Sequence, residues 1–294
     1  MQKRSPKAPS ASQHNRSAFT LIELMIVIVI ILILIGLLIP AVGAVRLRAQ
    51  QQQVRSEIGS LEAAITAFRQ DFGMDPPSGI NLYETSSGWA SDQRSKGLIR
   101  KMWPQFDFSL GRDINKDGTV STGAAGQIPL NAGECLVFFL GGIWDVSGKT
   151  PNGFSKNSAN PFAVANAGGG RLGPYMEFDT SRFVDIDSDG APEYLDSFPS
   201  QQKPYLYFSS YDGRGYRVSE VTGTGMVDVY RLGDPTTPPP TNDVPFKAKS
   251  YQIISPGADF DYGTGGNYDP KRNLPGNRSA ESDNITNFVN TSIQ

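Results

Sequence analysis

The sequence predicts an α+β protein in which a long N-terminal helix, transmembrane in its first half and amphipathic in its second, packs on a small antiparallel β-sheet domain with long loops. Three observations lead there. The run Leu24–Val45 contains no charged residue. Apolar residues then recur at helical spacing as far as Phe72. From Met74 onward the chain is rich in Gly, Pro, Ser, Asn and Asp, with short apolar or aromatic runs.

The uncharged run is long enough to cross a bilayer, which takes about 20 apolar residues in a helix. We therefore expect a membrane-spanning helix over residues 19–45. The alternative is a buried core helix, but a helix this apolar on every face would need a large protein around it. Residues 1–18 read as a leader with a charged beginning, because they contain no acidic residue and four basic ones, Lys3, Arg4, Lys7 and Arg16.

An ordinary secretory signal would place its cleavage site after the apolar run, where residues 40–44 (PAVGA) offer small side chains. The run is longer than the roughly 7–15 residues of such a signal, however, and it continues into a patterned helix. The small residue that matters is therefore expected before the run, at Ala18.

The segment Ala18-Phe19-Thr20-Leu21-Ile22-Glu23, followed by the apolar run, resembles the prepilin cleavage and methylation motif of type IV pilins and type II secretion pseudopilins. The resemblance implies a pilin-like fold, cleavage between Ala18 and Phe19 by a membrane prepilin peptidase, and N-methylation of Phe19. Ala18 departs from the glycine that is usual before the cut. Pro40 falls where many of these proteins carry a helix-loosening proline.

Glu23 precedes the apolar run, and a carboxylate in lipid is costly without a partner. Once the leader is removed, the amine of Phe19 is a cation in or near lipid, and Glu23 of a neighbouring subunit can neutralise it. Glu23 is therefore a predicted assembly residue. Pro40 is a second one, because of its place in the resemblance to pilins. The alternative is that Glu23 lies at the membrane surface with its carboxylate in water.

The second half of the helix, residues 46–73, is predicted from a stripe of apolar residues among polar ones: Leu47, Val54, Ile58, Leu61, Ile65, Phe68 and Phe72. No turn signal separates it from the membrane segment, so we expect one helix from Phe19 to Phe72. Gly73 suits the position after the last turn, and Pro76-Pro77 prevents resumption. The stripe is expected to pack on the chain's own domain, since fewer than four heptads argue against a coiled coil.

The domain, residues 74–294, contains one strongly apolar stretch at 133–144 (GECLVFFLGGIW), expected in the core as a short helix or strand. Residues rich in Tyr, Val and Ile predict strands that form an antiparallel sheet covered by the long helix. The predicted strands are 204–210, 215–221, 226–232 and 249–255, and 234–241 is an exposed loop.

Composition excludes several functions. The formal charge is −2, which becomes −6 without the leader, and no extended Lys/Arg cluster is present, so nucleic-acid binding is not expected. Cys135 is the only cysteine and His14, in the leader, the only histidine. An intramolecular disulfide, a CxxC zinc site and a His-dependent triad are thereby excluded. We expect no enzyme activity, and Cys135 as a packed small hydrophobe.

The acidic loop 185–196 (DIDSDGAPEYLD) predicts a calcium site in the manner of an EF-hand loop, the alternative being a solvated acidic turn. Its candidate ligands are Asp185, Asp187, Asp189, Glu193 and Asp196. The loop 113–124 (DINKDGTVSTGA) repeats the first half with Asp113, Asn115 and Asp117, but Ala124 stands at its twelfth position. A simple Asp-Gly turn is the alternative there.

The C-terminal segments SPGADFDYGTGG and ESDNITNF resemble the calcium-binding loop of the major pseudopilin of type II secretion. The resemblance implies that Asp259 and the pair Asp283-Asn284 hold the ion, with Asn284 giving a neutral oxygen where an aspartate is common.

These observations favour a pseudopilin: a single-pass subunit of the cytoplasmic (inner) membrane, with its C-terminal domain periplasmic or extracellular, that assembles into the helical filament of a type II secretion or type IV pilus system. The implied partners are other pseudopilins, a prepilin peptidase/methyltransferase, an assembly platform and an ATPase, with calcium as the implied ion. The alternative is a membrane-anchored, calcium-dependent periplasmic binding module or hydrolase.

Overall fold

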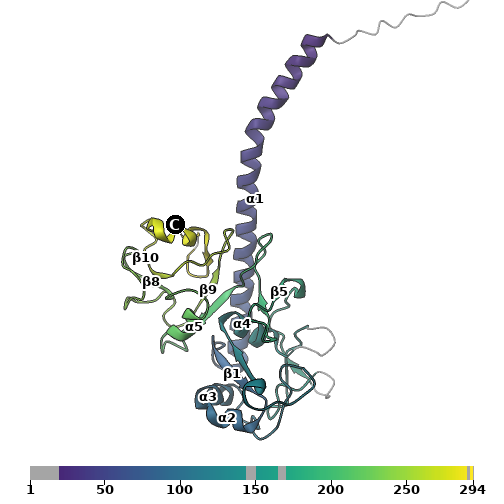
Figure 1. Ribbon diagram of the computed structural model, residues 1–294, viewed down its shortest axis with the longest axis vertical. Coiled ribbons are helices and arrows are strands. Elements are labelled where there is room, and N and C mark those ends of the chain that lie inside the picture. Colours follow the sequence, from purple (N-terminus) through teal and green to yellow (C-terminus); the bar gives the residue numbers. More distant parts are fainter. Residues whose placement is uncertain (1–19, 144–149, 165–169, 290–291, 294) are drawn as a thin grey trace, which may run out of the picture. The chain divides into compact units, whose positions relative to one another are not determined.

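The computed structural model describes residues 20–143, 150–164, 170–289 and 292–293 (Figure 1). The chain divides into two compact units, residues 1–49 and 50–294. Helix α1 (Leu21–Phe72) begins in the first unit and ends in the second, and its 52 residues rise about 78 Å. The prediction of one uninterrupted helix is confirmed over the described residues, and Phe19, its expected first residue, lies outside them.

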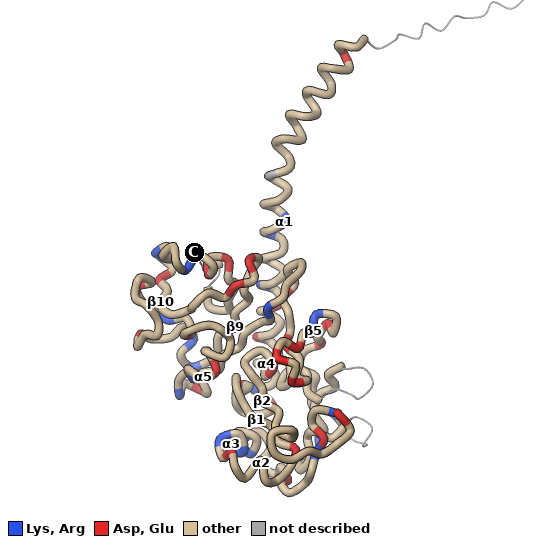
Figure 2. Tube along the Cα trace, viewed as in Figure 1, with Lys and Arg blue, Asp and Glu red and all other residues tan. Residues whose placement is uncertain are grey.

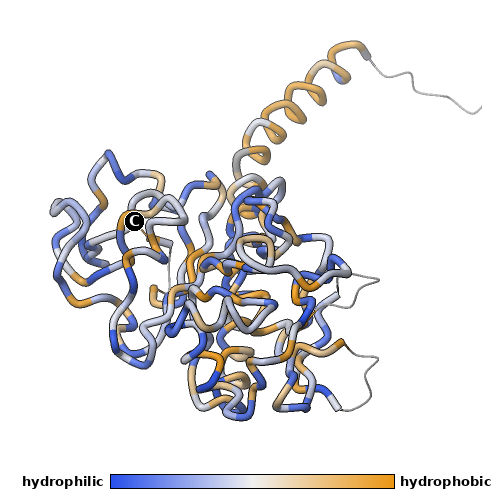
Figure 3. Tube along the Cα trace, turned by 60° about the horizontal axis from the view of Figure 1, so that its bottom comes forward, coloured by the Kyte–Doolittle hydropathy of each residue, from blue (hydrophilic) through white to orange (hydrophobic). Residues whose placement is uncertain are grey.

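The first unit consists, as far as it is described, of the first half of α1. Glu23 is the only charged residue between Leu21 and Val45. Figure 2 shows this part of α1 as tan apart from one acidic position near its start, and Figure 3 colours it mainly as hydrophobic. Its most apolar stretch has a mean hydropathy of 3.4 and none of it is buried in the protein. By length and composition this helix can cross a membrane.

The second half of α1 buries the predicted stripe. Val54, Leu61 and Phe68 are fully buried, and Ile58 and Ile65 are nearly so. They join one core with the domain, which confirms packing on the chain's own domain. After Phe72 the helix ends at Gly73, whose φ of +70° is the left-handed conformation expected of a terminating glycine.

Helix α4 (Ala132–Gly141) is the central element of the domain, and all ten of its residues are buried. The predicted core stretch 133–144 is thus a helix as far as Gly141, and its last residue, 144, lies outside the described residues. Asn131 and Glu134 form a capping box that fixes its start. Figure 1 shows α4 beside the C-terminal half of α1, where the rings of Phe139 and Phe68 meet edge to face at 5.8 Å. Cys135 is fully buried within α4, as expected of a packed small hydrophobe, and burial raises the pKa of its thiol.

A three-stranded antiparallel sheet packs against α4. Its order is β11 (Ile285–Thr286), β9 (Tyr251–Ser255) and β7 (Leu206–Ser209), with Leu206 opposite Ile254. The predicted strands at 204–210 and 249–255 are confirmed as β7 and β9.

The other two strand predictions need correction. Residues 215–221 do not form a strand, because helix α5 (Val218–Thr222) occupies their end and brings Val221 into a second core cluster. Of residues 226–232 only β8 (Tyr230–Leu232) is a strand. It pairs in parallel with β10 (Gly266–Tyr268) instead of joining the sheet. Both errors arise because apolar and aromatic residues in short runs fit either period.

The remaining described elements are short pairs and helical turns that surround this core. Three further antiparallel pairs are β1 (Ile80–Tyr83) with β2 (Gln127–Leu130), β3 (Phe154–Ser155) with β4 (Arg171–Leu172), and β5 (Phe183–Val184) with β6 (Glu193–Tyr194). The short helices are α2 (Ser86–Ser91), α3 (Gln93–Met102), η1 (Gly123–Gly126), η3 (Thr180–Arg182) and η4 (Gly276–Asp283).

A polar contact joins α1 to the segment around η3. Arg182 donates from its two terminal nitrogens to the two carboxylate oxygens of Glu57, at 2.9 and 2.8 Å. The hydroxyl of Tyr205 donates to the same carboxylate at 2.8 Å. The guanidinium also lies over the ring of Tyr194, 4.4 Å from its centroid. A two-bond, partly buried pair of this kind fixes geometry as well as charge.

Replacing Phe68 by alanine should show how much the stability of the domain depends on the α1 stripe. We expect the free energy of unfolding to fall by about 3–5 kcal/mol, because a fully buried ring is replaced by a cavity. Gln70→Ala, at an exposed position of the same helix, is the control and should change it by less than about 0.5 kcal/mol. Denaturant unfolding of the detergent-solubilised protein measures both, and equal effects would contradict this packing.

Candidate functional site

The predicted processing residues Ala18 and Phe19 lie outside the described residues, which begin at Thr20. Thr20 and Glu23 form a reciprocal cap on the start of α1. The amide of Glu23 donates to Thr20 Oγ1 at 3.3 Å, and Glu23 Oε2 accepts from the amide and the hydroxyl of Thr20 at 2.8 and 2.9 Å. One oxygen of this carboxylate therefore has hydrogen-bond partners within its own chain, independent of any contact with another subunit.

The other oxygen, Glu23 Oε1, has no hydrogen bond with any residue that the structure describes. The predicted pairing of Glu23 with the amine of a neighbouring copy involves a second chain and stays a prediction. The pattern Thr20-x-x-Glu23 before an apolar run is a capping-box signature. This signal in the sequence predicts a helix start at Thr20, which the sequence analysis missed. The other predicted assembly position, 40, lies inside α1, which remains helical through it.

The acidic loop that begins at Asp185 folds on its own first carboxylate. Asp185 accepts from the amides of Asp189 and Gly190, at 3.2 and 3.1 Å, and Asp189 Oδ1 accepts from the amide of Ala191 at 2.9 Å. Ser188 and Gly190 both have positive φ, +62° and +92°. These bonds close a sharp turn at the start of the loop.

The loop that begins at Asp113 has the same conformation. Asp113 Oδ2 accepts from the amide of Gly118 at 3.1 Å, and Asp117 Oδ1 accepts from the amide of Thr119 at 2.8 Å. Lys116 and Gly118 have φ of +64° and +90°, close to the values at the matching positions of the other loop. Asn115, the remaining predicted ligand of this loop, donates from Nδ2 to Asp117 Oδ2 at 3.1 Å. The repeated sequence pattern therefore has a structural counterpart.

The loop 185–190 faces a residue that sequence reasoning missed, Glu134 in the first turn of α4. One carboxylate oxygen of each of Glu134, Asp187 and Asp189 lies within 4.8 Å of the others. Figure 2 shows acidic positions gathered beside the α4 label. The capping-box pattern of Asn131 and Glu134 predicts a helix start, but nothing local reveals which loop will face that helix end.

Burial governs the electrostatics of this group. Glu134 is 1% exposed, and burial, with the nearby carboxylates of Asp189, Glu193 and Asp187, raises its pKa to about 9. Burial likewise raises the pKa of Asp189 to about 6. Glu134 Oε1 and Asp189 Oδ2 are buried without a hydrogen-bond donor among the described residues. Such unpaired buried oxygens are rare in folded proteins.

The remaining predicted ligands of this loop have other partners. Asp196 accepts from the amide of Phe198 at 2.9 Å, from Gln201 Nε2 at 2.9 Å and from Ser255 Oγ at 2.6 Å. It is not a member of the group around Glu134, and its predicted role as a calcium ligand stays a prediction. Glu193 accepts from Asn131 Nδ2 at 3.3 Å and from the amide of Ile186 at 3.2 Å, which joins α4 to the loop.

At the C-terminal candidate the structure brings two distant segments together. Asp283 Oδ2 accepts from the amides of Ala258 and Asp259, at 2.6 and 3.1 Å. Asn284 is fully buried, and its Nδ2 donates to the hydroxyl of Tyr230 and the carbonyl of Tyr262, each at 2.9 Å. Asn284 therefore makes hydrogen bonds to buried residues of the core. Calcium binding at this C-terminal candidate stays a prediction.

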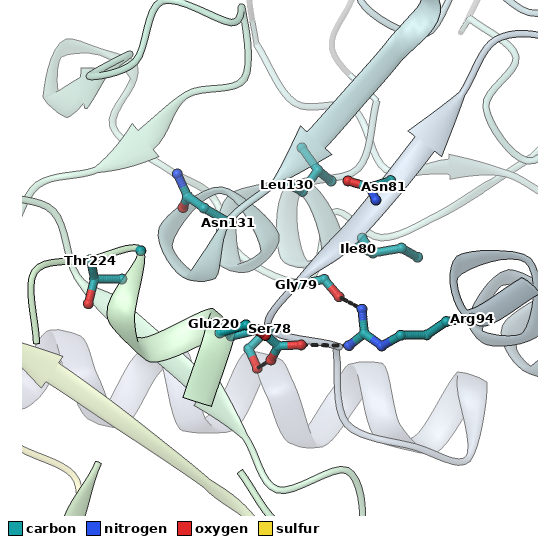
Figure 4. Close-up of a pocket in the computed structure, with 11 residues that line it drawn as sticks. Ser78, Gly79, Ile80, Asn81, Arg94, Leu130, Asn131, Glu220 and Thr224 are labelled. Carbon is teal, nitrogen blue, oxygen red and sulfur yellow. Dashed lines mark hydrogen bonds and ion pairs between the residues drawn. The ribbon is translucent and has the colours of Figure 1, made fainter. Parts of the chain in front are cut away.

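A cavity of about 200 Å³ lies at the start of β1 (Figure 4). Its charged residues are Arg94 and Glu220, which pair at 2.5 Å, while Ser78 Oγ donates to Glu220 at 2.7 Å. Arg94 also donates to the carbonyl of Gly79 at 2.8 Å. The charges of Arg94 and Glu220 neutralise one another. We therefore interpret the contacts around the cavity as joining α3, α5 and β1, and not as a binding site.

A family model described as the prokaryotic N-terminal methylation motif matches residues 13–39. No curated protein and no solved structure matches the chain. The matched segment contains Ala18, Phe19 and Glu23 and ends within the first half of α1.

Glycine replacement tests the conformation shared by the two acidic loops. An added Cβ would meet nothing within 4 Å at Gly118 or Gly190, so the cost of alanine there is conformational. We expect Gly118→Ala and Gly190→Ala each to destabilise the protein by about 1–2 kcal/mol, because φ is near +90°. Gly97→Ala, within α3 and equally open, should instead stabilise by up to about 1 kcal/mol. Thermal unfolding of the three variants gives the signs, and a shared sign would contradict the loop geometry.

Proposed function

We propose that this type IV pilin-like protein, which carries the prokaryotic N-terminal methylation motif, is a structural subunit of a helical filament in a type II secretion or type IV pilus system. The observation that carries the proposal is the position of that motif at the start of a helix whose first half is apolar on every face. In type IV pilin-like proteins this motif is the substrate of the prepilin peptidase. Removal of residues 1–18 leaves Phe19 as the new N-terminus, and its amine is then methylated.

The first half of α1 supplies the contacts between subunits. Its side chains are exposed in the single chain, for example Leu32 at 65% and Leu37 at 70%. Lipid covers them before assembly, so the hydrophobic effect contributes little to their association, and close packing and polar pairing contribute more. In a bundle of such helices the amine of Phe19 and the carboxylate of Glu23 are the charged groups that need partners.

The geometry at Glu23 supports a pairing across subunits. Its Oε2 is held by its own Thr20, which fixes the direction of the carboxylate. Its Oε1 has no partner among the described residues and can accept from the amine of an adjacent copy. The pair would set the axial register of neighbouring subunits, since an amine one helical turn away would leave both charges unpaired in lipid.

Location and partners follow from the same premise. Charge alone does not set the orientation, because the basic leader faces Arg46, Arg48 and Arg55 beyond the span. The resemblance to type IV pilins implies a cytoplasmic leader, and with it a single span and a C-terminal domain on the periplasmic or extracellular side. An assembly platform in the membrane and a cytoplasmic ATPase would extract the subunit into the filament. The rival, a binding module or hydrolase with α1 as a simple anchor, requires neither processing at Ala18 nor contacts between copies.

Processing is tested by the mass of the mature chain. In cells that contain the prepilin peptidase we expect the protein to lack residues 1–18 and to begin with methylated Phe19, and in cells without it to be full length. Ala18→Gly should be cleaved at least as completely, because glycine is the smallest residue at the cut. Intact-protein mass spectrometry decides, and a full-length functional protein would contradict the proposal.

The role of Glu23 is tested by separating its charge from its cap. Glu23→Gln keeps a carbonyl that can accept from Thr20 but has no charge. Thr20→Val removes the two hydrogen bonds of the hydroxyl and keeps the carboxylate with its backbone bond to residue 20. We expect processed Glu23→Gln protein to remain in the membrane without entering filaments, and Thr20→Val to assemble. Pelleting of sheared filaments with immunoblotting measures this. Normal assembly of Glu23→Gln together with failure of Thr20→Val would show that Glu23 acts only as a cap.

A further inference from the structure

The start of α4 lies in close contact with the strand that follows the acidic loop. A Cβ added at Gly133 would come within 2.9 Å of Glu193 Cγ and 3.3 Å of the Tyr205 carbonyl oxygen. Only glycine lets the helix end approach β6 this closely. Glu134, the next residue, is thereby placed against the loop 185–190, which precedes β6.

The carboxylate of Glu134 is half satisfied. Its Oε2 accepts from the amide of Asn131 at 2.6 Å, as the capping box requires, while its Oε1 is buried with no donor among the described residues. Asp189 Oδ2 is buried without a donor as well. Burying carboxylate oxygens without a donor or a cation is costly, and bringing carboxylates together adds repulsion. A bound cation removes both costs.

The spacing of the group fits one hard divalent ion. Calcium holds oxygen ligands at about 2.3–2.6 Å, so two ligands on opposite sides of one ion lie up to about 5 Å apart. The three oxygens of Glu134, Asp187 and Asp189 lie within 4.8 Å of one another. All three are carboxylates, which favours calcium over zinc, whose ligands in proteins are mainly histidine and cysteine.

The site also has room for further ligands. Asp187 and Glu193 line a cavity of about 250 Å³, which admits water to the open side of the group. Lys203 lines the same cavity, but its ammonium pairs with Asp261 at 3.3 Å. Water molecules can therefore complete the six to eight oxygens, approximately, that calcium prefers.

We propose that Glu134, Asp187 and Asp189 together bind one calcium ion, which links the loop 185–190 to the first turn of α4. The site differs from an EF-hand loop, because its third carboxylate comes from a helix far away in the sequence. The linked loop follows Arg182, which pairs with Glu57 of α1. Binding therefore stabilises the segment that connects the domain to the helix.

The matching loop at 113–118 serves as an internal comparison. The fully buried Glu84 lies beside it, but both of its oxygens accept from loop amides, Oε1 from Ile114 at 2.9 Å and Oε2 from Ser121 at 2.8 Å. The ammonium of Lys116 lies in this loop and donates to the carbonyl of Asp113 at 2.5 Å. Asp113 Oδ1 is buried without a donor among the described residues, as Glu134 Oε1 is. The satisfied carboxylate of Glu84 and the positive charge of Lys116 nevertheless both disfavour a cation here, so the proposal assigns the ion to one of the two loops only.

The test uses the purified full-length protein in detergent, stripped of divalent ions with a chelator. Calcium chloride alone is titrated by calorimetry, and thermal unfolding is followed with and without it. Glu134→Gln and Asp189→Asn remove one charge each at nearly constant shape. Asp117→Asn, at the position of the other loop that matches Asp189, is the control. Asp283→Asn reports separately on the C-terminal loop.

We expect the wild type to bind calcium and unfold at a higher temperature with it. Glu134→Gln and Asp189→Asn should lose about tenfold or more in affinity at one site, and Asp117→Asn should stay within about twofold. Without calcium, Glu134→Gln should unfold no lower than the wild type, because a neutral amide of nearly the same shape is no costlier to bury than a carboxyl group that lacks a cation. The proposal would be overturned if the wild type neither bound calcium nor gained thermal stability from it. It would also be overturned if Glu134→Gln and Asp189→Asn bound calcium with the affinity of the wild type, even if Asp283→Asn revealed a calcium site in the C-terminal loop.

Discussion

One continuous helix has to satisfy two surroundings, and the rest of the structure depends on that constraint. The first half of α1 is uncharged after Glu23 and exposes its side chains on all faces, which only lipid or other helices of the same kind can cover. The second half reduces its apolar surface to one stripe, from Val54 to Phe68, which the domain covers. The helix is therefore apolar on all faces in one unit and amphipathic in the other, and each unit is described by its own surroundings.

The domain meets the stripe with a core that is mainly aromatic and helical. Helix α4 is wholly buried between α1 and the small sheet, and its phenylalanines contact Phe68 and the rings of nearby loops. Much of the surrounding chain consists of short pairs and loops that contribute little stability individually. With one cysteine, the chain has no intramolecular disulfide to fasten them. Ion pairs such as that of Arg182 with Glu57, and the cation proposed beside α4, can hold these loops in place without a disulfide.

The same local motif occurs at the two places to which we assign function. Thr20 with Glu23 and Asn131 with Glu134 are both capping boxes, and in both the glutamate uses one oxygen on its own cap. The second oxygen has no donor among the described residues in either case. At the membrane end it is available to the amine of another copy, and inside the domain it faces two aspartates. A capping glutamate is held rigidly by its own helix, which suits it to present a charge in a fixed direction.

The sequence by itself determined the elements whose signals are local. Helix α1 follows from hydrophobic periodicity, its end from Gly73, and the turns at Asp113 and Asp185 from their spacing of Asp, Asn and Gly. It also placed the core at residues 133–144, without deciding between helix and strand. Short runs that fit either period were misread at 215–221 and 226–232.

Only the tertiary structure decided which acidic residues come together. It brings Glu134 to Asp187 and Asp189, and directs Asp196 to Ser255 and Gln201 instead. The distinction between the two acidic loops arises in the same way from the neighbours Glu84 and Glu134, together with Lys116 within one of the loops. The physical reason is that caps, turns and periodicity depend on residues a few positions apart, whereas a site built from distant segments depends on how helices and strands pack.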